Sequence, residues 1–142
     1  PSLGYKFEYK GRSLVITGDT SYAQSVIDNA KDVDVLFHEA QANHMVDILQ
    51  NFAAENGALL RAKVMTDIKT YHTTLLEAAE IANKANVKQL VFYHLTPAPR
   101  NYLTELIFVR GVDEIREEWM LAEDGSLIIL PANSNKIILS NM

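Results

Sequence analysis

Short apolar segments alternate with helix-like segments along this chain, and this alternation constrains its fold more than any other feature. Residues 14–17, 33–37 and 87–93 are apolar runs with the length of buried strands. Between them lie stretches whose apolar residues recur every three or four positions, as in amphipathic helices. Strands that alternate with helices predict an α/β fold in which a sheet packs against helices.

Hairpins are expected at both ends of the chain. Tyr5, Phe7 and Tyr9 alternate with charged residues, and residues 5–17 therefore read as a hairpin that turns at Lys10-Gly11-Arg12. Near the other end, residues 119–121 and 127–130 are expected to pair with each other. The turn between them would be Glu123-Asp124-Gly125.

Helix starts are marked by two capping-box patterns, Ser21 with Gln24 and Thr74 with Glu77. A longer helix is expected from Asn43 to Glu55, and another is expected before Gly111. The segment from Asn56 to Tyr71 is ambiguous, and another short helix with a loop is expected there. The apolar stripe of the longer helix consists of Met45, Ile48, Leu49 and Phe52.

Composition narrows the possible functions. A chain of 142 residues is expected to form one domain, residues 1–142. Thirteen basic and eighteen acidic residues give a net charge of −5, which argues against a surface that coats nucleic acid but permits a local basic cleft. The chain has no cysteine, so a metal would need His, Asp or Glu ligands. No apolar run approaches the ~20 residues of a membrane span, and no membrane partner is expected.

Polar residues follow each apolar strand: Asp19, then His38 with Glu39, then His94. The carboxyl ends of parallel strands meet at one edge of a sheet, where ligands usually bind. His72 joins this group from the segment ahead of a capped helix. Taken singly, Asp19 is explained as a turn residue and each histidine as a core or flanking residue. Together they favour a site, whereas His44 is expected on the surface of its helix.

Five stretches of the chain resemble hydrolases of the metallo-β-lactamase fold, and among them the ribonuclease Z and arylsulfatase-like proteins. They cover roughly the first 100 residues in order. The stretches are Gly4–Tyr9 (GYKFEY), Ser13–Thr20 (SLVITGDT), Asp34–Ala40 (DVLFHEA), His72–Ala79 (HTTLLEAA) and Leu90–Pro97 (LVFYHLTP).

The resemblance implies a role for each candidate residue. Asp19 would bridge two zinc ions, and His94 would bind the second ion. His38-Glu39-Ala40 resembles the H-E-A-T motif of ribonuclease Z, with Gln41 in place of its Thr, and His72-Thr73-Thr74 resembles the H-S-T motif. His72 would then donate a proton to the leaving oxygen, oriented by Glu39. His38, Glu39 and His72 are thus the candidate catalytic residues.

The sequence differs from that family in one respect that decides which part of the fold we expect. The H-x-H-x-D-H motif, which supplies most of the family's metal ligands, does not occur in this sequence. Asp19 and His94 alone fall short of the three protein ligands of a catalytic zinc. We therefore expect the C-terminal half of a metallo-β-lactamase αββα sandwich, a mixed sheet with flanking helices. This chain would be inactive by itself and would bind zinc weakly or not at all.

The function expected of the longer parent is hydrolysis of a phosphodiester, with RNA as the implied substrate; a sulfate ester or a lactone is the weaker possibility. The alternative is a non-catalytic α/β interaction domain that has kept the fold. A receiver-like domain is disfavoured, because its first strand should be followed by an acidic cluster.

A homodimer is also expected, because half of a sandwich would leave one sheet face uncovered. That face should carry Tyr5, Phe7, Val15, Leu36 and Phe92.

Overall fold

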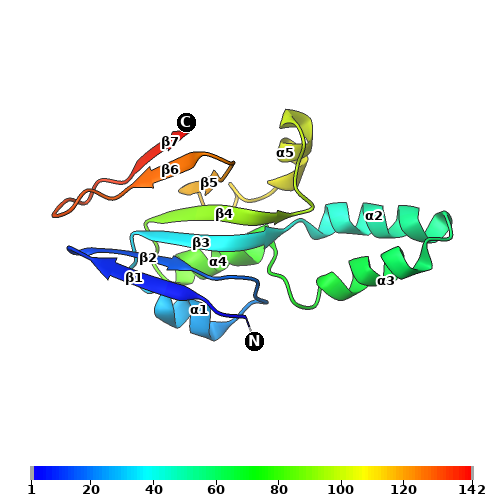
Figure 1. Cartoon of the computed structure of the whole chain (residues 1–142), viewed down its shortest axis with the longest axis horizontal. Helices are drawn as coiled ribbons and strands as arrows, with labels where there is room; N and C mark the ends of the chain where they lie inside the picture. The colour runs from blue at the N-terminus through cyan, green and yellow to red at the C-terminus, as the bar shows by residue number, and fades with distance from the viewer. Residues whose placement is uncertain (1, 142) are drawn as a thin grey trace.

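A mixed sheet of five strands organises the structure, a computed structural model that describes residues 2–141 (Figure 1). Its strands lie in chain order, with β1 antiparallel to β2 and the remaining neighbours parallel. The predicted α/β class, with a mixed sheet and flanking helices, is therefore confirmed. The strands are β1 (Tyr5–Tyr9), β2 (Arg12–Ile16), β3 (Val35–Gln41), β4 (Gln89–Thr96) and β5 (Trp119–Leu121).

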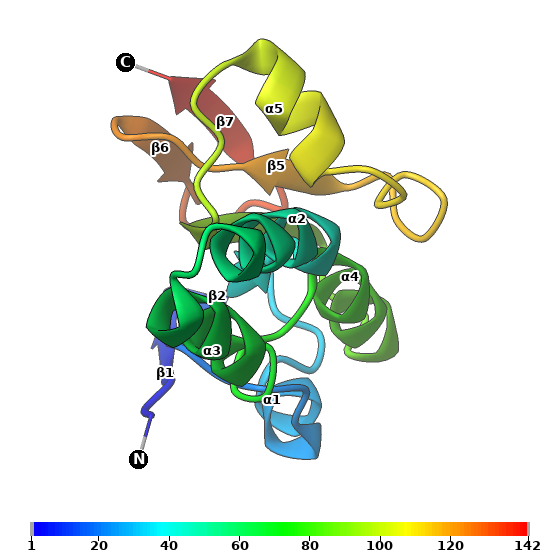
Figure 2. The same cartoon turned by 90° about the vertical axis from the view of Figure 1, so that its right-hand side faces the viewer.

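Two helices, α1 (Gln24–Asn29) and α4 (Leu75–Lys84), cover one face of this sheet (Figure 2). The capping box of Thr74 and Glu77 is present at the start of α4. The box predicted from Ser21 and Gln24 is wrong, because α1 begins only at Gln24 and its N-cap is Ala23, without a side-chain cap. The largest fully buried side chains of the core between helices and sheet include Leu36, Ile81, Leu90, Phe92 and Phe108.

The opposite face of the sheet is open near β1, but its residues differ from those expected. Tyr5 lies opposite Ile16 and Phe7 opposite Leu14, and the two aromatic side chains are 59% and 53% exposed. Val15, Leu36 and Phe92 belong to the helix-covered core and are buried. The prediction was wrong for these three residues, because successive side chains of a strand point to opposite faces.

A helical hairpin extends beyond the end of the sheet (Figure 1). It consists of α2 (Asn43–Glu55), whose predicted bounds are confirmed, and α3 (Leu59–Ile68), which resolves the ambiguous segment as a helix. No residue of α3 is buried, and Ile48, Phe52 and Leu60 are 64%, 66% and 77% exposed. Among residues 2–141, no helix has the length and apolar character needed to cross a membrane.

The predicted terminal hairpin is wrong. Strand β5 pairs with β4 in parallel, and the next strand, β6 (Ser126–Ile129), pairs instead with β7 (Ile138–Asn141). The Trp119 ring lies 5.9 Å from the Phe92 ring, so packing on the core outweighs the local turn signal. The short helix α5 (Tyr102–Phe108) lies between β4 and β5 in the chain, as expected.

A buried ion pair joins the sheet to the C-terminal segment. The Nε atom of Arg12 lies 3.0 Å from Oδ2 of Asp34, and Lys88 Nζ lies 2.7 Å from Oδ1. Arg12 Nη1 also donates to the carbonyl oxygens of Pro131 and Lys136. The pair therefore ties β2 to the segment that leads into β7.

Candidate functional site

The carboxyl ends of β2, β3 and β4 meet at one edge of the sheet, because these three strands are parallel. Asp19 follows β2, while Glu39 and His94 lie within β3 and β4, which run further than expected. His72 comes from the segment between α3 and α4. The structure thus brings four of the five predicted site residues together.

Glu39 and His72 form a buried pair. The Oε2 atom of Glu39 lies 3.1 Å from Nδ1 of His72, and the two side chains are 0% and 9% exposed. Neither atom has another hydrogen-bond partner among the described residues. Oε1 accepts hydrogen bonds from the backbone N–H groups of Thr73 at 2.8 Å and Thr20 at 3.3 Å. Burial raises the pKa of the Glu39 carboxyl, against the lowering effect of these N–H groups and of His72.

Asp19 and His94 form a second pair, which is open to solvent. The Oδ1 atom of Asp19 lies 2.6 Å from Nδ1 of His94, and the side chains are 55% and 48% exposed. The rings of His94 and His72 are 5.9 Å apart and meet edge to face. The four side chains therefore form one continuous series, from buried Glu39 to exposed Asp19.

A β-bulge orients His94. Glu39 is paired with Tyr93 and Ala40 with Leu95, so His94 is an extra residue that has no partner on β3. Its φ of 46° lies in the left-handed region, which is uncommon for a residue with a side chain. Bulges of this kind redirect a side chain and are frequent next to active sites.

The loop that carries Asp19 is anchored on both sides. The N–H of Gly18 donates to the hydroxyl of Tyr93 at 2.9 Å, and the N–H of Thr20 donates to Glu39. The hydroxyl of Thr73 donates to the carbonyl oxygen of Thr20. Sequence reasoning missed Tyr93, Thr20 and Thr73. Their only signal was that each directly adjoins a predicted site residue.

His38 lies apart from these four residues. It pairs with Phe92 across β3 and β4, on the helix-covered face, and is fully buried. Its Nδ1 lies 2.8 Å from the Glu39 carbonyl oxygen, and its Nε2 has no partner among the described residues. Burial lowers the pKa of its imidazole to about 4. Its catalytic role stays a prediction. His44 is exposed on α2, as expected, with Nε2 2.7 Å from the Ile107 carbonyl oxygen.

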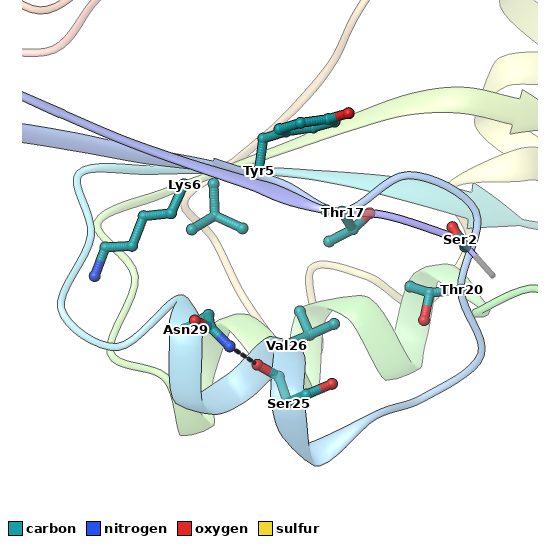
Figure 3. A pocket seen from close by; sticks show the side chains of 10 residues that line it. Ser2, Tyr5, Lys6, Thr17, Thr20, Ser25, Val26 and Asn29 are labelled. Atoms are coloured by element: carbon teal, nitrogen blue, oxygen red, sulfur yellow. Dashed lines mark hydrogen bonds between the residues drawn. The ribbon is translucent and has the colours of Figure 1, made fainter.

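Two hollows adjoin this edge. A cavity of about 230 Å³ lies between the β1–β2 hairpin and α1 (Figure 3). It is lined partly by the hydroxyl groups of Thr17, Thr20 and Ser25, and neither Asp19 nor His94 lines it. A more open hollow of about 660 Å³ includes His94, Arg100 and Tyr102. Of the Asp19–His94 pair, His94 lines the open hollow and Asp19 does not.

The zinc site that the sequence resemblance predicts is not tested by the structure, but the donor types of Asp19 and His94 suit it. A carboxylate oxygen and an imidazole nitrogen are both common zinc ligands. No group of three His, Cys, Asp or Glu residues within residues 2–141 could hold a metal ion. These two residues could therefore supply part of a site whose other ligands come from elsewhere.

Comparison with known proteins identifies relatives of part of this chain. It is 37% identical over 87 residues to a ribonuclease Z of Anoxybacillus flavithermus, which covers 61% of this chain and 22% of the relative. It is 31% identical over 126 residues to a ribonuclease Z of Sulfolobus acidocaldarius, which covers 89% of this chain and 36% of the relative. No family model matches the chain. The chain thus spans less than two fifths of the length of these relatives.

The fold has a counterpart among solved structures. The metallo-β-lactamase fold protein YhfI from Bacillus subtilis superimposes with a TM-score of 0.53 at 19% identity, over 82% of this chain and 39% of that one. At 19% identity this similarity is evidence for the fold only. The chain therefore has part of the metallo-β-lactamase fold, and its sequence is similar to part of the ribonuclease Z relatives.

Proposed function

We propose that this chain is part of a ribonuclease Z-like hydrolase that cleaves phosphodiester bonds in RNA. The observation that carries the proposal is the series of Glu39, His72, His94 and Asp19 at one sheet edge. A buried carboxylate–histidine pair directly beside an open one combines a proton donor with metal-binding groups. The relatives named ribonuclease Z support RNA as the substrate class.

His72 would serve as the general acid. Its Nδ1 faces Glu39, so the other ring nitrogen, Nε2, is left to hold the proton that the leaving oxygen needs. Glu39 is itself held by the N–H groups of Thr73 and Thr20, and it therefore fixes both the tautomer and the direction of the imidazole. His38, behind the same strand, would support Glu39 through its backbone contact.

Asp19 and His94 would bind zinc in the complete protein. Bound zinc would supply Lewis-acid activation of water and would neutralise charge at the phosphate. With only two of the donors, the isolated chain would hold zinc weakly and would be inactive. The remaining ligands would come from a part of the complete protein that corresponds to the part of the relatives that this chain does not span.

The test is turnover of an RNA substrate by the longer parent protein. His72→Ala should lower kcat by roughly 10²–10⁴-fold while the zinc content stays unchanged. Asp19→Ala should remove both zinc and activity. A His72→Ala protein that has lost its zinc would contradict the role of proton donor.

We also propose that the chain pairs with a second copy of itself. The exposed aromatic side chains of β1 support this: Tyr5, Phe7 and Tyr9 are 59%, 53% and 72% exposed. The exposed side chains of the α2–α3 hairpin offer a second apolar surface. Sedimentation of the Phe7→Glu and Phe52→Glu variants distinguishes the two candidate interfaces, because only the variant at the true interface should become monomeric. A wild-type chain that stays monomeric at micromolar concentrations would rule out pairing.

A further inference from the structure

We propose that Tyr93 is a positioning residue that holds the Asp19 carboxylate beside His94. This rests on the proposed function only in treating Asp19 and His94 as metal donors. The proposal depends on one contact in the structure: the Tyr93 hydroxyl accepts a hydrogen bond from the Gly18 N–H at 2.9 Å. Seventy-five residues separate the two partners in sequence.

The position of Tyr93 gives this contact its effect. Tyr93 directly precedes His94 on β4, and Gly18 directly precedes Asp19. A single hydrogen bond therefore connects the residue before one member of the open pair to the residue before the other. The spacing of Asp19 and His94, 2.6 Å between Oδ1 and Nδ1, depends on two backbone segments that this bond joins.

A small set of hydrogen bonds holds the loop at this point. The backbone pairing of β2 with β3 ends with the hydrogen bond from Thr17 N–H to the Phe37 carbonyl oxygen at 3.1 Å. Beyond it, the Gly18 N–H is held by Tyr93, the Gly18 carbonyl oxygen accepts from the Thr17 hydroxyl at 2.8 Å, and Thr20 is held by Glu39 and Thr73. Asp19 lies between these two anchors, with its carboxylate free to face His94.

The backbone at Gly18 is constrained, and its N–H points toward the Tyr93 hydroxyl. Its φ is +65°, and a Cβ atom there would lie 2.7 Å from the Leu3 carbonyl oxygen. The backbone conformation is therefore one that only glycine adopts without strain.

The Tyr93→Phe variant tests the proposal, because it removes the hydroxyl and keeps the ring that fills the space. Tyr22→Phe is the matched control, because it also removes one hydroxyl, which accepts a hydrogen bond from Lys84 at 2.7 Å and not from Gly18. Both variants should unfold at a urea concentration close to that of the wild-type chain.

The first readout is amide hydrogen exchange together with a crystal structure of each variant. In Tyr93→Phe the Gly18 amide should exchange on the order of tenfold faster, and Asp19 should separate from His94. The control should change neither. Unchanged Gly18 exchange together with an unchanged Asp19–His94 distance in Tyr93→Phe would overturn the proposal.

The second readout is zinc affinity, measured by titrating the chain with zinc chloride and following the His94 ring by NMR. Loss of an outer residue that orients a ligand typically weakens metal binding 10–100-fold, and we expect roughly tenfold weaker binding for Tyr93→Phe. Equal zinc affinity in both proteins would overturn the positioning role. A wild-type chain whose His94 does not respond to zinc would instead count against the proposed metal site, and the exchange data alone would then decide the role of Tyr93.

Discussion

The site contains two carboxylate–histidine pairs of the same chemistry in opposite surroundings. The Glu39–His72 pair is buried, and both carboxylate oxygens of Glu39 are engaged by His72, Thr73 and Thr20. In the Asp19–His94 pair each side chain is about half exposed, and the two side chains contact each other at the surface. Burial therefore distinguishes the two pairs more than their distances do.

The difference in burial suits the two pairs to different tasks. A buried carboxylate that is held by backbone N–H groups through one oxygen and faces its histidine with the other keeps the imidazole in one orientation, which suits proton transfer. An exposed pair can separate at little cost, which suits groups that must turn toward a metal ion or a substrate. The edge-to-face contact of His72 and His94 places the rigid pair directly beside the adaptable one.

The largest effect should come from breaking the buried pair. Glu39→Ala removes the acceptor of His72, Thr73 and Thr20 in a buried place, and we expect it to lower the free energy of unfolding by about 3–5 kcal/mol. The measurement is urea denaturation followed by circular dichroism.

The matched control is Asp19→Ala, which should change the free energy of unfolding by less than about 0.5 kcal/mol, because the open pair is exposed to solvent. Equal effects of the two substitutions would show that burial does not separate the pairs.

The pH dependence of stability offers a second comparison, with Asp34 as the reference acid. Burial acts to raise the pKa of Asp34, but the hydrogen bonds from Arg12 and Lys88 lower it to about 2. A carboxyl whose pKa is lowered by folding stabilises the fold above its unfolded pKa, and this contribution is lost as the pH falls through the folded value. We expect a loss of about 1–2 kcal/mol between roughly pH 4 and pH 2, absent in Asp34→Asn.

Glu39 should show the opposite sign, because its pKa is raised by burial. Its contribution is present at low pH and is lost as the pH rises through the folded pKa. Urea denaturation of Glu39→Gln across the acid range should lack this decline. A decline of the same size in Glu39→Gln would assign it to another group.

A smaller effect is expected at the start of α4, which follows His72. The Thr74 hydroxyl accepts from the Glu77 N–H at 3.2 Å, and Thr74→Ala should cost about 1 kcal/mol. Ser21→Ala is the control, because the Ser21 side chain does not cap α1, and it should be nearly neutral. Thermal denaturation compares the two. A neutral Thr74→Ala would mean that the capping box does not stabilise the segment that carries His72.

The smallest effect concerns salt. Raising the ionic strength to about 1 M should weaken the contribution of the exposed pair and leave that of the buried pair unchanged. The double-mutant cycle of Asp19→Ala and His94→Ala, repeated at low and high salt, measures this. A coupling energy that does not respond to salt would show that the open pair is less solvated than its exposure indicates.

The sequence by itself determined those features that depend on neighbours along the chain. The hairpin of β1 and β2, the capping box of Thr74 and the bounds of α2 are such features, and the structure has all of them. The order of strand ends also predicted that Asp19, Glu39 and His94 meet, because parallel strands present their carboxyl ends at one edge. His72 was added from its place ahead of a capped helix.

Only the tertiary structure decided the features that depend on distant partners. The partner of β5 is set by packing of Trp119 on Phe92, and the conformation of His94 by a bulge against β3. Tyr93 became part of the site through Gly18, a residue far from it in sequence. A local pattern contains no information on which of two faces or strands a segment will meet, because that choice follows from the burial and pairing of the whole sheet.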